Sequence, residues 1–162
     1  MIFEQIGALL VSIVLGALVG WERFTDRKPA GLRTHTLVSL GSTAFLLAAR
    51  DYLGEHGFTD AEMSRVMQGV IAGVGFLGAG AIFRTGSHVS GLTTAATIWM
   101  AASIGAAVGV GATGLAVVIT ILTWIVLRGF RVLEVWHGGK EPRRPPGSAS
   151  SPPALRRPTE DD

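Results

Sequence analysis

Long apolar stretches separated by short polar segments dominate this chain. They occupy residues 2–21, 34–53, 66–83, 92–110 and 112–127. A helix rises about 1.5 Å per residue, so about 20 apolar residues cross the roughly 30 Å hydrocarbon core of a bilayer. From residue 66 to residue 127 the only charged side chain is Arg84, and a soluble core could not absorb so much apolar chain. The pattern predicts an all-α polytopic membrane protein, a bundle of five transmembrane helices within residues 1–136.

The segment after the last apolar stretch has a different composition. Residues 137–162 are rich in Pro, Arg and Ser and hold almost no large apolar side chain. Such a segment cannot bury enough apolar surface to offset the entropy that folding would remove. We expect it to form a disordered tail.

The distribution of basic residues predicts the orientation in the membrane. Five spans put the two termini on opposite sides, and 12 of the 14 Lys and Arg residues then lie on the side of the tail, with Arg50 and Arg65 on the other. Segments rich in Lys and Arg remain in the cytoplasm. We therefore expect the N-terminus outside and the C-terminal tail in the cytoplasm.

The third and fourth apolar stretches are unusually rich in Gly, Ala and Thr. Small residues let membrane helices approach closely, and Thr hydroxyl groups can bond to a neighbouring helix. Because the third stretch carries small residues on two faces, we expect it to lie at the centre of the bundle. The expected helix-packing residues are Gly69, Gly73, Gly75, Gly78, Gly80, Thr94 and Thr97.

Residues 73–78, Gly-Val-Gly-Phe-Leu-Gly, also match the fingerprint of a dinucleotide-binding turn. That site needs an acidic residue about 20 positions later to bind the ribose. No Asp or Glu lies between Glu62 and Glu134, so the ribose partner is missing. We expect no nucleotide cofactor.

Candidate acids and bases lie at the ends of the apolar stretches. A hard cation such as Mg²⁺ prefers oxygen ligands, usually carboxylates, and the interiors of the stretches offer none. No spacing typical of a hydrolase or a metalloenzyme is present, and the chain has no cysteine. We expect no enzymatic activity, no catalytic residue, no metal site and no cofactor. The interior polar side chains are Ser39, Ser42, Thr43, Gln68, Thr94, Thr97 and Ser103.

Charged residues gather on the expected cytoplasmic side. The candidate functional cluster consists of Glu22, Arg23, Lys28, Arg33, His35 and Arg84. One interpretation is a solvated basic anchor that is attracted to anionic lipid. The other is a built site, because Pro29 and Gly31 impose a particular backbone path that an anchor would not need. In that case we expect Arg33 and Arg84 to meet and to share Glu22, the alternative being that the three side chains point separately into headgroups.

Two long motifs resemble a known family. Residues 20–42 read GxERxxxxKPAGLRTHxLVxxGS, and residues 73–111 read GxGFLGAGxIxxxGxxVxGLTTAATIWxxAxIGxAxGxG. They are similar to the N-terminal membrane domain of the MgtC/SapB family, over about residues 15–114. The resemblance implies a bacterial inner-membrane protein linked to growth at low Mg²⁺, to intracellular survival in some pathogens, and to ATP synthase inhibition in one branch. The chain departs from the family at Phe24-Thr25-Asp26, where members often carry a further acidic residue, and it lacks the soluble C-terminal domain of the longer members.

Two functional hypotheses follow from these observations. The first is a regulatory or adaptor membrane subunit, which binds another membrane protein through small-residue helix faces and cytoplasmic loops. The second is a transporter or channel for Mg²⁺ or another ion, built between copies of the chain. The expected partners are the lipid bilayer and either another membrane protein or further copies of the chain, with no nucleic acid.

Overall fold

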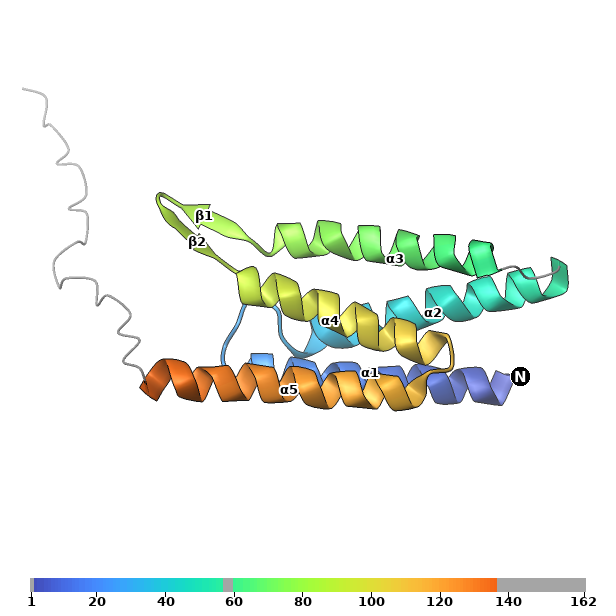
Figure 1. Cartoon of the computed structure of the whole chain (residues 1–162), viewed down its shortest axis with the longest axis horizontal. Coiled ribbons are helices and arrows are strands. Elements are labelled where there is room, and N and C mark those ends of the chain that lie inside the picture. Colours follow the sequence, from blue (N-terminus) through green and yellow to red (C-terminus); the bar gives the residue numbers. More distant parts are fainter. Residues whose placement is uncertain (1, 57–59, 137–162) are drawn as a thin grey trace, which may run out of the picture.

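Five helices running back and forth along a common direction form the molecule (Figure 1). The structure is a computed structural model, and it describes residues 2–56 and 60–136. The helices are α1 (Ile2–Thr25), α2 (Leu32–His56), α3 (Asp60–Gly80), α4 (Leu92–Gly109) and α5 (Thr113–Trp136). The prediction of an all-α bundle is confirmed, whereas the predicted tail at residues 137–162 lies outside the described residues.

A short hairpin joins α3 to α4, in the break between the third and fourth apolar stretches. Its strands are β1 (Phe83–Thr85) and β2 (His88–Ser90), which pair antiparallel with Arg84 opposite Val89. Gly91 then precedes α4 with φ of 89°, a left-handed conformation that favours glycine. A side chain at Gly91 would also collide with the carbonyl group of Ala81, so the chain can enter α4 in this way only with glycine.

The centre of the bundle is α4, which contacts each of the other four helices. One apolar cluster joins it to α1 and α5 and includes Val19, Ile104 and Ala116. A second cluster, which includes Val74 and Ile98, joins it to α3. The apolar core therefore lies on both sides of α4.

Close approach of the helices depends on glycines of α1 and α4. A Cβ atom at Gly16 would lie 2.7 Å from the Cβ of Ser39, and one at Gly20 would lie 2.7 Å from the Cα of Leu32. A Cβ at Gly105 would overlap the backbone of Ser39. The backbone of α2 thus rests directly on α1 and on α4.

The expectation that the third helix lies centrally is wrong. α3 packs against α2 and α4 at the edge of the bundle (Figure 1). A Cβ added at Gly69, Gly73, Gly75 or Gly80 would have no atom within 4 Å, and one at Gly78 would be in ordinary contact with Ala95. α4 is central because its small residues allow the backbone of α2 to pack directly against it. Packing of the α3 glycines against a neighbouring molecule stays a prediction.

Three of the five helices are long and apolar enough to cross a membrane. They are α1, α4 and the part of α5 up to Phe130. α2 and α3 run alongside them in the bundle but carry more polar residues. The structure therefore supports three candidate spans, and the predicted five spans and the orientation of the termini stay predictions.

Candidate functional site

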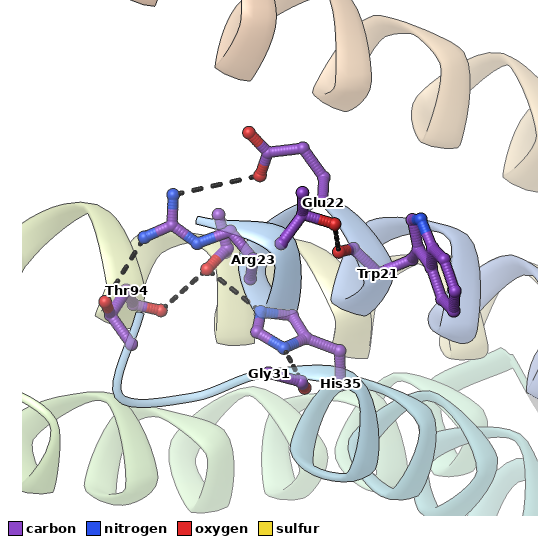
Figure 2. A network of polar contacts seen from close by, with 8 residues as sticks. Trp21, Glu22, Arg23, Gly31, His35 and Thr94 are labelled. Atoms are coloured by element: carbon purple, nitrogen blue, oxygen red, sulfur yellow. Dashed lines mark hydrogen bonds and ion pairs between the residues drawn. The ribbon is translucent and has the colours of Figure 1, made fainter. Parts of the chain in front are cut away.

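Polar side chains from three helices meet inside one end of the bundle (Figure 2). Glu22 and Arg23 belong to the last turn of α1, His35 to the first turn of α2, and Thr94 and Thr97 to the beginning of α4. All five residues are buried. The absence of a side chain at Gly20 allows the beginning of α2 to lie against α1, which brings His35 into this network.

Arg23 is the charged centre of the network. Its residue is only 4% exposed, and its Nη2 atom donates a hydrogen bond to Thr94 Oγ1 at 3.3 Å. Its Nη1 atom lies 4.0 Å from Glu22 Oε2, and Glu22 is 2% exposed. A buried charge without a counter-charge is strongly unfavourable, so the neighbouring carboxylate makes burial of the guanidinium possible.

The pairing of these two residues is incomplete. Glu22 Oε2 and Arg23 Nε are both buried and have no hydrogen-bond partner among the described residues. Breaking such a pair by removing one member leaves an uncompensated charge, which is costlier than the loss of the contact itself. Ionisable groups inside a membrane protein most often have a functional role.

His35 is fully buried and ties α2 to α4. Its Nδ1 atom lies 2.8 Å from the carbonyl oxygen of Gly31, and its Nε2 atom lies 3.0 Å from Thr97 Oγ1. A carbonyl oxygen only accepts hydrogen bonds, so Nδ1 must carry a proton. Thr97 Oγ1 is also 2.9 Å from the carbonyl oxygen of Thr94, to which it can donate.

The contact between α2 and α4 continues below His35 through hydroxyl groups. Thr43 Oγ1 lies 2.7 Å from the carbonyl oxygen of Gly105 and 3.1 Å from that of Ser39. Ser39 and Thr43 are buried. His35, Ser39 and Thr43 recur every four residues and share one helix face, although the Ser39 hydroxyl group has no hydrogen-bond partner among the described residues. That spacing is the signal that could have assigned Thr43 to the contact between α2 and α4.

Only half of the predicted cytoplasmic cluster is brought together. Glu22, Arg23 and His35 lie in the network, whereas Lys28, Arg33 and Arg84 are exposed. Arg84 belongs to the hairpin, where its Nε atom donates to the carbonyl oxygen of Gly86 at 3.1 Å. The expectation that Arg33 and Arg84 share Glu22 is therefore wrong. Arg33 and His35 are two residues apart on one helix, so they point about 200° apart and only one of them can face inward.

Thr94 and Thr97 are predicted as helix-packing residues. Both are buried where α4 packs against α1 and α2. Their hydroxyl groups contact Arg23 and His35. In the described part of the chain, no group of three or more His, Cys, Asp or Glu side chains could hold a metal ion. The network can hold charge and protons, and it joins three helices at one point.

An apolar groove opens on another part of the surface, between α2 and α3. Its volume is about 660 Å³. The glycines Gly41, Gly69 and Gly73 form part of its wall, and Leu37 and Phe45 flank it. The groove is separate from the polar network.

Comparison with known proteins gives consistent matches. The model of the MgtC family matches residues 9–136. SrpB of Synechococcus elongatus is 44% identical over 135 residues, which are 78% of this chain and 74% of SrpB. MgtC of Brucella abortus is 41% identical over 110 residues, which are 68% of this chain and 44% of that protein. YhiD of Escherichia coli K12, whose name describes a magnesium transporter candidate, is 38% identical over 133 residues, 77% of this chain and 59% of YhiD.

The chain therefore spans only about half the length of the MgtC and YhiD relatives that it matches. No solved structure gives a significant match. The family match covers all five helices apart from the first turns of α1. The chain belongs to the MgtC family.

Proposed function

We propose that this chain is a regulatory or adaptor subunit of the bacterial inner membrane that supports growth when Mg²⁺ is limiting. The name of one relative, the magnesium transporter candidate YhiD, connects the family with magnesium. We assign to the chain no catalytic reaction, metal or cofactor. Its partner in this proposal is another membrane protein, or further copies of the chain.

The proposed topology has five spans, with the N-terminus outside and the C-terminus in the cytoplasm. α2 and α3 run alongside the three more apolar helices, and at about 1.5 Å per residue each is long enough to cross the hydrocarbon core. The polar network then lies at the cytoplasmic end, near the basic residues Arg27, Lys28 and Arg33. An excess of Arg and Lys on that side supports this orientation.

The observation that carries the regulatory proposal is the contrast between inner and outer small residues. Buried hydrogen bonds of Arg23, His35 and Thr43 join α1 and α2 to α4, so they help to hold the bundle together. The glycines Gly69, Gly73 and Gly80 of α3 instead share one exposed helix face, and Gly69 and Gly73 line an apolar groove. In membranes small residues are enriched where one helix packs against another. The exposed face of α3 is therefore suited to the helix of a partner.

An ion-conducting oligomer is the second candidate function. The observation in its favour is the buried pair of Glu22 and Arg23, whose incomplete hydrogen bonding leaves polar atoms available inside the bundle. The name of YhiD points in the same direction. In this alternative the pair would line a pathway completed by other copies.

Two measurements separate the candidates. The first is complementation of a deletion strain at low Mg²⁺ with the wild type, Gly73→Leu and Gly129→Leu. Both glycines are exposed with no atom near a Cβ, but Gly129 lies on α5 and away from the groove. We expect the wild type and Gly129→Leu to restore growth, and Gly73→Leu to fail although it accumulates in the membrane with unchanged thermal stability.

The second measurement is Mg²⁺ flux into liposomes that contain the purified protein. The regulatory proposal predicts no flux above that of empty liposomes. Flux that is lost in Glu22→Gln would instead favour the ion-conducting oligomer. Normal growth with Gly73→Leu would contradict the role of the α3 face.

A further inference from the structure

The hydrogen bonds around His35 can be counted proton by proton. Nδ1 must donate to the Gly31 carbonyl oxygen, since that oxygen only accepts. The Thr97 hydroxyl has a single proton, but it lies within bonding distance of two groups, His35 Nε2 and the Thr94 carbonyl oxygen. The charge of His35 therefore decides which way the Thr97 proton points.

Two states of the network follow. When His35 is neutral, Nε2 is an acceptor, and Thr97 donates to it and gives up its bond to Thr94. When His35 is charged, Nε2 donates to Thr97, and Thr97 donates in turn to the Thr94 carbonyl oxygen. The charged state therefore makes one more hydrogen bond than the neutral state.

The surrounding charges oppose the charged state. α1 contributes Arg23 and Glu22, and their charges already cancel. α4 contributes only the hydroxyl groups of Thr94 and Thr97, and residues 66–80 of α3 carry no charge. On α2 itself Arg33 is exposed, as are Arg27 and Lys28 of the preceding loop, where Asp26 is half-buried. A proton on His35 would thus add a second buried cation beside a single buried carboxylate.

The cost of burying an uncompensated charge exceeds the net gain from one hydrogen bond. We propose that His35 is a proton-responsive latch, which in its neutral form ties the beginning of α2 to α4 and on protonation releases this contact. Histidine is the side chain whose ordinary charge change falls between pH 5 and 8, so the latch would respond to acidification on the side of the membrane that this end of the bundle faces. The inference rests on the geometry of the network and does not depend on the proposed regulatory function.

The first test needs no substitution. The protein is labelled with ¹⁵N-histidine, reconstituted in lipid nanodiscs, and studied by NMR from pH 8 to pH 5. We expect His35 at pH 8 to give the signals of a neutral ring protonated at Nδ1, and to become charged at lower pH. A ring protonated at Nε2, or a His35 that is charged at pH 8, would overturn the proposal.

The second test measures the movement. The chain has no cysteine, so two introduced cysteines can be spin-labelled specifically. Arg33→Cys and Thr93→Cys place labels on exposed positions at the beginnings of α2 and α4. We expect the distribution of distances between the labels to shift to longer values as the pH falls, with the midpoint that NMR gives for His35.

His35→Gln and His88→Gln provide the matched comparison. Glutamine is uncharged at every pH, and His88 is an exposed histidine on the hairpin. We expect the pH-dependent shift to disappear in His35→Gln and to persist in His88→Gln. A wild-type distance that is the same at pH 8 and pH 5, or an equal shift in His35→Gln, would show that His35 is not the latch.

Discussion

Three pairs of glycines with the same spacing have different environments in this molecule. Gly16 and Gly20 on α1, and Gly105 and Gly109 on α4, lie where a Cβ atom would collide with α2. Gly69 and Gly73 on α3 have the same separation of four residues, yet a Cβ at either would meet no atom within 4 Å. Spacing alone therefore identifies a helix face that can be approached, but not the helix that approaches it.

The exposed face of α5 sharpens this difference. α5 is also at the periphery, but its exposed positions carry large apolar side chains such as Leu122 and Ile125. On α3 the exposed positions include four glycines, and Phe76 protrudes among them with 79% exposure. Bulky side chains make extensive contact with lipid, whereas glycines favour contact with another helix. The two peripheral helices are thus suited to different surroundings.

We call the two glycine pairs that α2 covers, on α1 and on α4, the closed pairs, and the pair on α3 the open pair. The largest effect is expected from adding a side chain at the closed pair on α4. In Gly105→Val the new side chain would overlap the backbone of Ser39, which cannot move without separating α2 from α4. We expect a loss of more than about 3 kcal/mol in the free energy of unfolding, above the usual range for overpacking. Denaturation with SDS in mixed micelles measures it, with Gly73→Val as the control. Equal stability of the two variants would remove the distinction between closed and open pairs.

A smaller change at the other closed pair gives an intermediate effect. In Gly20→Ala the Cβ atom would lie 2.7 Å from the Cα of Leu32, so the α1–α2 contact must widen. We expect a loss of about 1–3 kcal/mol in the free energy of unfolding. The same measurement on Gly69→Ala should show almost no change. A Gly20→Ala protein as stable as the wild type would indicate that α1 and α2 are less tightly packed than described.

Removing a hydroxyl group where α2 packs against α4 tests whether hydrogen bonds add to the stability that close packing provides. Thr43→Val keeps the shape of the side chain and removes its bonds to the carbonyl oxygens of Gly105 and Ser39. We expect a loss of about 0.6–1 kcal/mol in the free energy of unfolding. Ser103→Ala is the control, because Ser103 bonds only within its own helix, to Trp99. If both variants lose the same amount, the bonds between helices add no stability of their own.

The smallest effect is expected at the open pair. Gly73→Ala meets no atom and replaces glycine with a better helix former. We expect the free energy of unfolding to change by less than about 0.5 kcal/mol. A loss above that value in the purified monomer would place another helix of the same chain against Gly73.

Much of the fold could be predicted from the sequence because its signals are local. The five apolar stretches give five helices, and the polar break at Pro29 and Gly31 gives the connection between α1 and α2. The sequence does not predict the hairpin at residues 83–90, since its strands are short and show no apolar alternation. The end of the first helix also differs from its apolar stretch, which stops at residue 21, because α1 continues through the charged residues Glu22 and Arg23.

The arrangement of the helices and of the site depends on contacts between distant residues. The sequence indicates that Glu22, Arg23 and His35 belong together, but not that Thr94 and Thr97 complete the network. Proximity in sequence also groups Arg33 with them, although it lies on the opposite face of α2 from His35. Likewise, only the match between the glycines of α4 and the backbone of α2 determines that α4, and not α3, is central.

The most direct test of the central claim is photo-crosslinking in living cells. A photoreactive amino acid replaces Phe76 on α3 or, as the matched control, Leu122 on α5, both of which are exposed. We expect a protein adduct of one defined mass from position 76, its loss when Gly73→Leu is added, and no such adduct from position 122. Adducts of equal yield from both positions, or an adduct from position 76 that persists with Gly73→Leu, would contradict the claim that the glycine face of α3 binds a partner.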